Sequence, residues 1–362
     1  MDKNVVQKKS VLIVMPKLFW GGAEAQFRML FETLMNNGDD PYIIAIGKSF
    51  NSSDYKNFIK KNASSVKELF RRIKLNKLTV LFINIILLIY VFKLRMKGVR
   101  NLIVYETYWL LFIDIYKLLS INVIYSERNN GEHKHHYMYK LIAKCNFVTT
   151  NSVEAKNILE RAIVDKKIEL VNNGVRINPL KLENIDNKFK IYKVVVPARI
   201  CEVKNQLLVV NALHEVEGIM VYFAGNISEE NYYKALLEKI KALQQQDKFI
   251  FDGYVDNWLE KYKGFNLVLL PSLEEGTSNV ILESYSNGRM VLVSDIPMNK
   301  RLVKDENFLF TSNNVSSLRN AILRLMKLSD EERSFIVEKN HIYVKNNYSV
   351  SCMVDAFKSK FI

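Results

Sequence analysis

The chain has 362 residues, of which 49% are hydrophobic and 25% are charged. These proportions exclude a largely disordered chain, and the length favours two domains over one hydrophobic core. The three cysteines form no C-x-x-C pair, which argues against a disulfide framework or a zinc site and favours a reducing compartment. The first fifteen residues contain no apolar run long enough for a secretory signal, so we expect a cytoplasmic protein.

The positive charge is concentrated in one region. The net charge is +14, and residues 51–100 alone hold twelve Lys or Arg against two acidic residues. Such a region suits an anionic partner, namely a membrane surface, a nucleic acid or a pyrophosphate-bearing substrate. The alternative is an ordinary solvated surface in a lysine-rich protein.

An apolar segment follows at 80–92 and is flanked by Lys77 and Lys93. Thirteen helical residues extend about 20 Å, which is short of the ~30 Å hydrocarbon core of a bilayer. We therefore expect a helix that is buried in the first domain or lies in the membrane interface, and not a membrane span.

Short apolar runs alternate with longer helical stretches, which is typical of βαβ units and parallel sheets. Strands of a first sheet are expected at 11–15, 42–46, 102–105, 123–125, 147–150 and 170–171. Strands of a second sheet are expected at 193–196, 220–224, 249–251, 267–270 and 290–293. The sequence thus predicts two doubly wound α/β domains, with ligands bound at the carboxyl ends of the strands.

The most informative segment is 271–295, which predicts a strand end, a loop and a helix start. Gly276 would allow a tight turn with a close backbone approach. Thr277, Ser278 and Asn279 are candidate N-cap residues, and the exposed N–H groups of such a helix start can bind a pyrophosphate.

Glu275 and Glu283 flank this helix start. Ionised carboxylates are strong hydrogen-bond acceptors, so the two suit recognition of hydroxyl groups on a sugar and a ribose. The alternative is an ordinary strand–loop–helix with two surface glutamates.

Two cations follow the first strand of the second sheet. Arg199 comes directly after this strand and Lys204 five residues later. Together they could bind a diphosphate and neutralise the charge on a leaving group, although the spacing alone also fits ordinary surface charge.

A further glycine loop follows the first strand of the chain. Gly21 and Gly22 allow a ligand to approach the backbone closely before a helix that begins near Glu24. The loop lacks the full G-x-G-x-x-G pattern, so a dinucleotide site is disfavoured.

With these segments in place, the chain resembles glycosyltransferase family four, the retaining enzymes of the GT-B fold. The motifs that carry the resemblance are GGAE at 21–24, NNGV at 172–175, AGN at 224–226, DGYVDN at 252–257 and EGTSNVILE at 275–283. The last motif, together with SERNN at 126–130, is similar to bacterial enzymes that add GalNAc or related sugars to polyprenyl-pyrophosphate-linked glycans.

The resemblance implies two Rossmann-like domains that face each other across a cleft. The implied divisions are an acceptor domain at 1–176, a linker at 177–190, a nucleotide-sugar domain at 191–347 and a returning terminal helix at 348–362.

The resemblance also implies roles for individual residues. The donor-binding set would be Arg199, Lys204, Gly276, Thr277, Asn279, Glu283, Tyr254, Val255, Gly21 and Gly22. In this set Arg199 and Lys204 hold the diphosphate, Glu283 the ribose, and the backbone at Tyr254 and Val255 the base. Glu275 would contact the donor sugar and is a candidate catalytic residue.

One departure from the family concerns the first domain, where many relatives carry a histidine near the reacting sugar. Arg128 stands at the corresponding place here. An arginine cannot act as a base at neutral pH but can stabilise negative charge. The proton of the acceptor could pass to the departing phosphate oxygen, and Glu127 and Glu106 are alternative bases.

Three histidines cluster at 132–136, and His133 and His136 would share one face of a helix. No further ligand completes a recognisable metal pattern, so we expect no metal and no cofactor beyond the nucleotide-sugar substrate.

These features together predict a metal-independent, retaining glycosyltransferase. Its donor would be a nucleotide sugar, with UDP favoured, and its acceptor a glycan or a polyprenyl-pyrophosphate-linked glycan of a bacterial O-antigen or capsule pathway. Residues 67–97 would hold it on the inner face of the cell membrane. The alternatives are a nucleotide-sugar 2-epimerase of the same fold and a basic nucleic-acid or membrane-surface binding protein. Nucleic acid is disfavoured because the basic cluster precedes an apolar helix.

Overall fold

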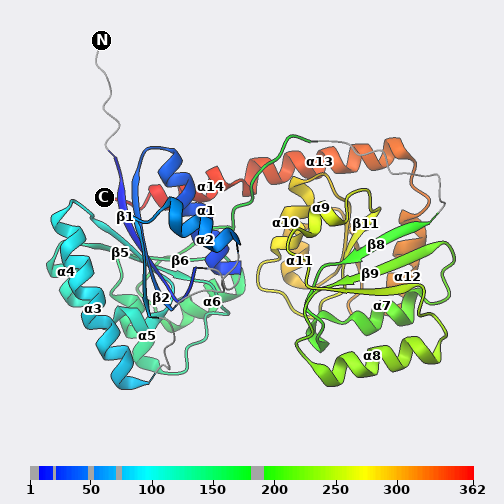
Figure 1. The fold of residues 1–362 in the computed structure, drawn as a ribbon, viewed down its shortest axis with the longest axis horizontal. Helices are drawn as coiled ribbons and strands as arrows, with labels where there is room; N and C mark the ends of the chain where they lie inside the picture. The colour runs from blue at the N-terminus through cyan, green and yellow to red at the C-terminus, as the bar shows by residue number, and fades with distance from the viewer. Residues whose placement is uncertain (1–7, 19–21, 48–52, 71–75, 181–190) are drawn as a thin grey trace, which may run out of the picture. The chain divides into compact units, whose positions relative to one another are not determined.

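The computed structural model describes residues 8–18, 22–47, 53–70, 76–180 and 191–362 (Figure 1). The chain divides into two compact units. The N-terminal unit is Met1–Gly174 with Val350–Ile362, and the C-terminal unit is Val175–Ser349. Most of the expected linker, residues 181–190, lies outside the described residues.

The N-terminal unit contains a seven-stranded parallel sheet of order β3-β2-β1-β4-β5-β6-β7. Its strands are β1 (Ser10–Met15), β2 (Asp40–Gly47), β3 (Val66–Phe70), β4 (Asn101–Val104), β5 (Asn122–Glu127), β6 (Phe147–Thr150) and β7 (Ile168–Leu170). The sequence analysis missed β3. This edge strand buries only Val66 fully and includes a lysine and a glutamate, so it has no apolar run.

Two hydrophobic cores cover the two faces of this sheet. Leu12 and Val14 point into one core, whereas Val11, Ile13 and Met15 point into the other. This alternation follows from the two-residue period of a strand and explains why β1 is apolar throughout.

Helices pack on both faces of the sheet (Figure 1). The helices are α1 (Gly22–Asn36), α2 (Ser53–Lys61), α3 (Lys77–Met96), α4 (Ile113–Leu118), α5 (His136–Ala143), α6 (Val153–Ala162) and α14 (Val350–Lys358). Helices α1, α2 and α14 contribute to one core, and α3 to α6 contribute to the other.

The C-terminal unit contains a six-stranded parallel sheet of order β10-β9-β8-β11-β12-β13. Its strands are β8 (Tyr192–Val196), β9 (Ile219–Ala224), β10 (Phe249–Gly253), β11 (Leu267–Leu270), β12 (Val291–Ser294) and β13 (Leu309–Phe310). The two-residue strand β13 was not anticipated, because two residues show no periodicity.

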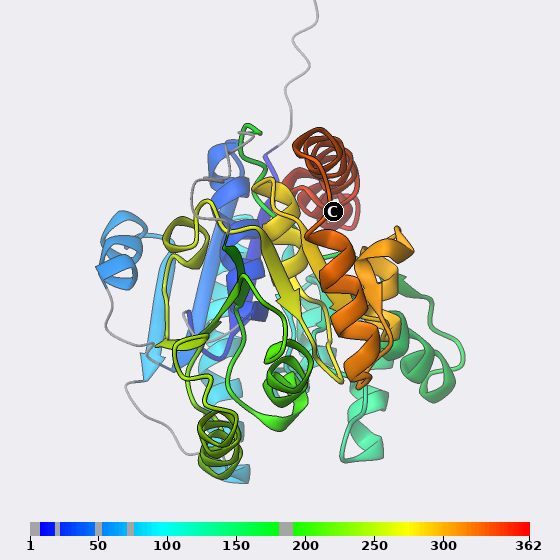
Figure 2. The ribbon, with the colours of Figure 1, turned by 90° about the vertical axis from the view of Figure 1, so that its right-hand side faces the viewer.

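Helices also lie on both sides of this second sheet, as the view toward the C-terminal unit shows (Figure 2). They are α7 (Gln206–Leu213), α8 (Glu230–Ala242), α9 (Trp258–Lys261), α10 (Asn279–Ser286), α11 (Pro297–Leu302), α12 (Val315–Leu325) and α13 (Asp330–Tyr348). Helix α10 packs against α13, and α7 packs against α8 and α12.

The strand orders define where ligands should bind. In the first sheet the chain reverses its winding between β1 and β4, and in the second between β8 and β11. The loops after two such strands leave the sheet in opposite directions and open a crevice at their carboxyl ends. These two switch points therefore locate a candidate site in each unit.

Helix α3 corrects the expected length of the apolar helix. It has 20 residues because Asn76 and Thr79 form a capping box before the apolar run, and Lys93 and Arg95 extend its last turn. By length and composition it could cross a bilayer. It is also not a simple core helix, since only Ile83, Asn84, Leu87 and Val91 are buried.

Candidate functional site

The β8/β11 switch point brings Lys204 and Glu275 into contact. Lys204 ends a 3-10 turn, η3 (Glu202–Lys204), between β8 and α7. Its Nζ lies 2.7 Å from Oε1 of Glu275, which also accepts a 2.7 Å hydrogen bond from Ser272 Oγ. Both side chains are largely buried, at 17% and 13% exposed. The pair is therefore a fixed part of the site.

Arg199 lies on the same loop after β8. Its side chain is exposed and makes no ion pair with a described residue, whereas its carbonyl accepts a 2.8 Å hydrogen bond from Gln206 Nε2. The guanidinium is thus available to a ligand, while the backbone beneath it is fixed.

Gly225 allows the loop after β9 to pack closely against the loop after β8, which carries Arg199. A Cβ at Gly225 would lie 2.1 Å from the carbonyl oxygen of Ala198. Only glycine fits this approach between the ends of β8 and β9. The AGN motif at 224–226 is accordingly a packing feature of the site.

Helix α10 begins where the sequence predicted. Ser278 is its N-cap and makes no side-chain capping hydrogen bond. Gly276 has no left-handed φ, and a Cβ there would meet nothing within 4 Å. The space beside its backbone is therefore open to a ligand.

Glu283 lies on α10 and accepts a 3.1 Å hydrogen bond from Trp258 Nε1. Burial raises the pKa of the Glu283 carboxyl, and the bond from Trp258 opposes this shift. The sequence analysis did not single out Trp258, although an indole N–H is a donor that needs a partner when it is buried.

Tyr254 and Val255 follow β10. Gly253 adopts a φ of +63° and turns the chain at the end of this strand. Tyr254 is 67% exposed and its hydroxyl donates to Asp256, at 3.2 Å, while Val255 is partly buried. This loop leaves the sheet two strands away from β8.

The β1/β4 switch point holds the N-terminal candidates. Gly22 is the exposed first residue of α1, whereas Gly21 lies outside the described residues. Glu24 in the first turn is buried and accepts a 2.7 Å hydrogen bond from the Tyr105 hydroxyl. Through this hydrogen bond, the glutamate of the GGAE motif links the first turn of α1 to the residue that follows β4.

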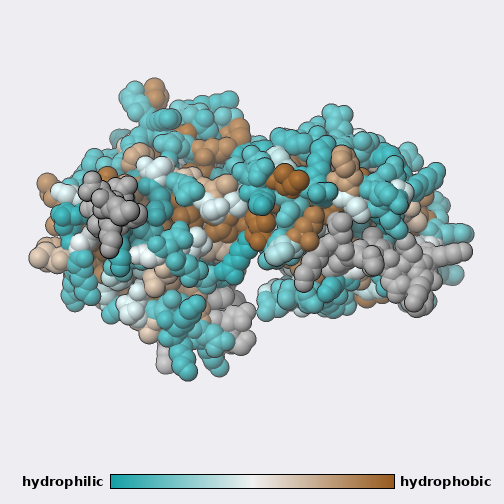
Figure 3. Space-filling view, turned by 90° about the horizontal axis from the view of Figure 1, so that it is seen from above, coloured by the Kyte–Doolittle hydropathy of each residue, from teal (hydrophilic) through white to brown (hydrophobic). Residues whose placement is uncertain are grey.

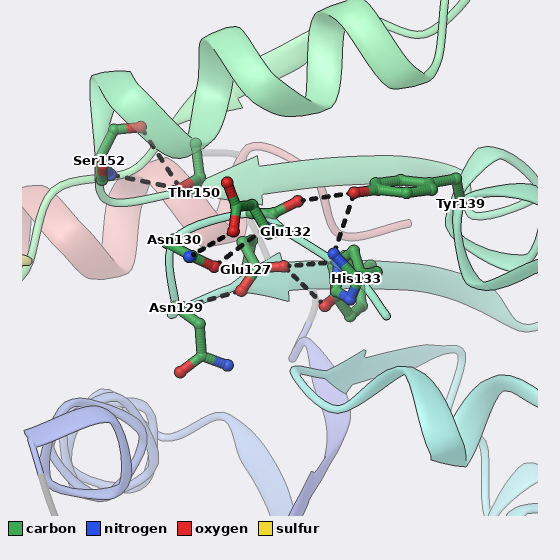
Figure 4. A network of polar contacts seen from close by, with 10 residues as sticks. Glu127, Asn129, Asn130, Glu132, His133, Tyr139, Thr150 and Ser152 are labelled. Carbon is green, nitrogen blue, oxygen red and sulfur yellow. Dashed lines mark hydrogen bonds and ion pairs between the residues drawn. The ribbon is translucent and has the colours of Figure 1, made fainter. Parts of the chain in front are cut away.

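Glu127 lies at the end of β5 in a dense polar network (Figure 4). Its Oε1 accepts from the backbone N–H of Asn129 at 2.8 Å. Its Oε2 accepts from the Tyr125 hydroxyl at 3.0 Å and lies 2.9 Å from His133 Nε2. Burial alone would raise the pKa of Glu127, but these donors outweigh it and the pKa is lowered. Glu127 is therefore a buried anion with both oxygens engaged.

His133 corrects the expectation for the histidine cluster. Helix α5 begins only at His136, so His133 lies in the preceding loop and the two do not share a helical face. In the part of the chain that is described, no three His, Cys, Asp or Glu residues are grouped to hold a metal ion.

Arg128 lies between two aromatic rings. Its guanidinium carbon is 5.1 Å from the ring centroid of Phe27 on α1 and 5.8 Å from that of Phe357 on α14. Its Nη1 donates to Asn173 Oδ1 at 2.9 Å, while Nε and Nη2 are buried without a partner among the described residues. Burial lowers the pKa of Arg128 to about 10, so it remains charged at neutral pH.

The NNGV motif has a structural role in this unit. Gln26 donates to the carbonyl of Gly174 at 3.1 Å and accepts from its N–H at 2.7 Å. The preceding residue, Asn173, is the partner of Arg128. The motif thus links α1 with the Arg128 environment.

Glu106 directly follows the β4 end at Tyr105. It is partly exposed, and its backbone carbonyl accepts a 3.1 Å hydrogen bond from the Trp109 N–H, whereas its carboxyl accepts none from a described residue. Burial, followed by the charges of Glu127 and Glu24, raises its pKa to about 7, while His133 lowers it. Glu106 therefore exchanges its proton near neutral pH.

The fold and the two switch-point clusters define the class of protein. Two parallel doubly wound α/β units of this kind form the GT-B fold. Residues 182–346 match the family model described as glycosyl transferases group 1, in agreement with the resemblance found in the sequence.

Two curated proteins are similar over part of their length. The UDP-Gal:alpha-D-GlcNAc-diphosphoundecaprenol alpha-1,3-galactosyltransferase of Escherichia coli is 35% identical over 103 residues, or 28% of this chain and 26% of that protein. The capsular polysaccharide biosynthesis glycosyltransferase CapH of Staphylococcus aureus is 25% identical over 169 residues, or 44% and 46%. The chain thus spans about a quarter and under half of these two relatives.

Solved structures are similar over nearly the whole chain. A glycosyltransferase from Rickettsia africae has a TM-score of 0.78 at 18% identity and covers 98% of this chain and 97% of its own. HepE from Anabaena, in complex with UDP and glucose, has a TM-score of 0.74 at 16% identity and covers 97% and 98%. At these identities the likeness establishes the fold.

Proposed function

We propose that this protein is a glycosyltransferase that moves a sugar from a UDP-linked donor to a glycan or polyprenyl-pyrophosphate-linked acceptor in bacterial surface-polysaccharide assembly. The observation that carries the proposal is the Lys204–Glu275 pair beside Arg199 at the β8/β11 switch point. The E. coli relative is named for a UDP-galactose donor and a diphosphoundecaprenol acceptor.

The donor diphosphate would bind to Arg199 and Lys204. An ammonium group has three N–H donors, and Lys204 uses one of them for Glu275. The remaining donors and the exposed guanidinium of Arg199 can neutralise the charge that develops on the leaving diphosphate. Backbone N–H groups at the start of α10, near Gly276, Thr277 and Asn279, would add contacts to the diphosphate.

Two carboxylates would bind hydroxyl groups of the donor sugar and the ribose, and the backbone of a loop would contact the base. Glu275 is fixed by Lys204 and Ser272, so its second oxygen can accept a hydrogen bond from a donor-sugar hydroxyl. Glu283, positioned by Trp258, would bind the ribose hydroxyls. The backbone at Tyr254 and Val255 would meet the base.

The reaction would proceed with net retention and without a metal or other cofactor. Retention is proposed from the resemblance to family four. Metal independence is supported by the two cations, which supply the charge neutralisation that a divalent ion gives elsewhere. Arg128 remains charged and would stabilise negative charge of a ligand at the N-terminal switch point.

The N-terminal unit would dock on the inner face of the cell membrane through α3. Its outward residues are apolar and exposed, namely Leu78, Leu81, Phe82, Ile85, Ile89, Phe92 and Met96. The face of the protein in Figure 3 is by contrast mostly hydrophilic. Lys77, Lys93, Arg95 and Lys97 flank this apolar surface and suit anionic headgroups. Docking would bring the enzyme to a lipid-linked acceptor.

The test is to incubate the protein in EDTA with UDP-, GDP- and CMP-sugars and a polyprenyl-diphosphate-linked sugar acceptor. Transfer from a UDP-sugar, with the donor's anomeric configuration in the product by NMR, would support the proposal. Release of an epimerised free sugar, without transfer, would instead establish the 2-epimerase alternative. Transfer that requires an added divalent ion would overturn the metal-independent mechanism.

A further inference from the structure

The segment between β4 and β5 exposes an apolar face of its own. Leu111, Ile115 and Leu118 are all exposed, and Leu118 reaches 84%. They follow one another at intervals of four and three residues, so they lie on one face of a helical segment. Ile113 and Tyr116 lie on the opposite face and are buried in the core. Helix α4 thus has a packed side and an apolar side that no described element covers.

Two hydrogen bonds hold this segment beside α3 (Figure 1). Asn84 Nδ2 of α3 donates to the carbonyl of Tyr108, in the 3-10 turn η1 (Thr107–Leu110), at 2.8 Å. Arg95 Nε, in the last turn of α3, donates to the carbonyl of Leu119 at 2.7 Å. The two bonds occur in the same order along both segments, so α3 and the segment that contains α4 run in parallel, side by side.

The exposed apolar side chains of α3 also lie opposite its buried ones. With about 100° of rotation per residue, Ile83, Leu87 and Val91 occupy one face, and the exposed apolar residues occupy the face directly behind it. Both helices bury their inner faces in the same core, so both outer faces point away from the same side of the sheet. The ten exposed residues form what we call the α3–α4 surface, namely Leu78, Leu81, Phe82, Ile85, Ile89, Phe92, Met96, Leu111, Ile115 and Leu118.

The charges around the α3–α4 surface suit an anionic bilayer. Residues 76–119 contain six Lys or Arg and two acidic residues. Of the two acids, Glu106 lies at the carboxyl end of the sheet, and Asp114 is paired with Lys144 at 2.6 Å. A second copy of this chain, docked through the same surface, would bring like charges together. Anionic headgroups would instead neutralise them.

We propose that the α3–α4 surface binds an anionic bilayer, with the apolar face of α4 inserted beside that of α3. The inference rests on the membrane docking in the proposed function and adds a second element to it. Apolar side chains of such a surface enter the boundary between headgroups and acyl chains, and the cations around them remain among the headgroups. The side chains of α4 therefore add apolar area to the contact that α3 makes.

Docking through two parallel helices also fixes the orientation of the N-terminal unit. Helix α3 returns from the end of β3 to the start of β4, and α4 returns from the end of β4 to the start of β5, so both run against the strands. When the sides of both helices face the bilayer, the strands lie along the membrane plane. The β1/β4 switch point then opens sideways, about 10 Å above the bilayer, since one helix diameter separates the sheet from the surface. A lipid-linked acceptor would reach it along the membrane.

The experiment compares flotation of the full-length protein with vesicles of phosphatidylcholine, with and without phosphatidylglycerol. The α4 variant carries Leu111→Gln, Ile115→Gln and Leu118→Gln. The matched control replaces three exposed apolar residues of the C-terminal unit and carries Leu237→Gln, Leu323→Gln and Ile342→Gln. We expect partitioning of the α4 variant into the anionic vesicles to fall by about tenfold or more, and that of the control to match the wild type.

Transfer assays distinguish docking from catalysis. With a water-soluble, short-chain diphosphate-linked acceptor, the α4 variant should transfer sugar at the wild-type rate. With the long-chain acceptor in vesicles, it should lose activity. Insertion of α4 is measured directly with Leu118→Trp, whose added fluorescence should be quenched by lipids that carry bromine on their acyl chains. This substitution is at a highly exposed position, so the test remains if the α4 variant does not fold.

Three results would overturn the proposal. One is vesicle binding by the α4 variant at the wild-type level, and another is Leu118→Trp fluorescence that brominated lipid does not quench. The third is a wild-type dimer that floats with no vesicle and that the α4 variant converts to a monomer, because the surface would then bind a second copy. Vesicle binding lost only in the α4 variant, without sugar transfer by any of the proteins, would support this inference and refute the proposed transferase activity.

Discussion

Lys204 Nζ lies 2.7 Å from Oε1 of Glu275, so a lysine that follows β8 is paired with a carboxylate that follows β11. The two residues are 71 positions apart in sequence and meet because β8 and β11 are neighbours in the sheet. The ion pair spans the switch point where a GT-B unit is expected to bind its ligand.

Lys204→Ala should weaken UDP binding by about 10- to 100-fold, since a charge-assisted hydrogen bond contributes about 1.5–3 kcal/mol. Titration calorimetry measures this directly. The matched control is Lys241→Ala on α8, which removes an exposed lysine away from the site. Equal affinity of both variants would remove Lys204 from the diphosphate site.

Comparison of Gly225→Ala with Gly276→Ala should distinguish a glycine that packing requires from a glycine that donor binding requires. A Cβ at Gly225 would meet the Ala198 carbonyl oxygen at 2.1 Å, so this variant should lose about 1–3 kcal/mol of unfolding free energy. A Cβ at Gly276 meets nothing within 4 Å, so Gly276→Ala should keep full stability and lose donor affinity. Denaturant unfolding and UDP titration of both variants give the comparison, and the reverse pattern would contradict these roles.

Glu106→Gln should stabilise the fold at high pH. The pKa of Glu106 is raised to about 7 in the folded protein, so the folded state binds its proton more tightly than the unfolded state does. Stability should therefore fall as pH rises from about 4.5 to 7, by on the order of 1–3 kcal/mol in total. The variant should lack this loss, so it should melt higher than the wild type at pH 8 and equally at pH 5. Equal melting at both pH values would show that burial and the neighbouring carboxylates do not raise the pKa of Glu106.

Replacement of Phe82, Ile85 and Ile89 by Gln should abolish binding to vesicles that contain anionic lipid. These side chains are 55%, 44% and 50% exposed on α3, so their loss should leave the packed face of this helix intact. Partitioning should fall tenfold or more, since burial of one such side chain is worth about 1.5–3 kcal/mol. Phe335→Gln on α13 replaces another exposed aromatic residue and serves as the control. Unchanged vesicle flotation of the triple variant would exclude α3 as the docking surface.

The sequence predicted the regular elements well where burial makes a strand apolar on both faces. Strand β11, for example, begins and ends where its apolar run does. The edge strands β3 and β13 were not predicted from the sequence. Strand β3 is half-exposed, and β13 has only two residues. Helix α3 was predicted too short because capping and basic residues extend a helix beyond its apolar part.

The candidate site was less accessible to sequence reasoning. Spacing along the chain suggested that Arg199 and Lys204 act together, but the partner of Lys204 is Glu275, which only the sheet order brings near. Likewise His133 was expected to share a helical face with His136, whereas it lies in the loop before α5 and contacts Glu127. The Lys204–Glu275 pairing depends on a long-range contact, and the His133–Glu127 pairing depends on the conformation of a loop, so no local sequence pattern records either.

The most direct test of the account is transfer of a radiolabelled sugar from its UDP-linked donor to a polyprenyl-diphosphate-linked acceptor, in EDTA, by the wild type and Glu275→Ala. We predict transfer by the wild type and loss of transfer by Glu275→Ala, with UDP still bound because Arg199 and Lys204 remain. Transfer by Glu275→Ala at the wild-type rate would contradict the assignment of the donor site to the β8/β11 switch point.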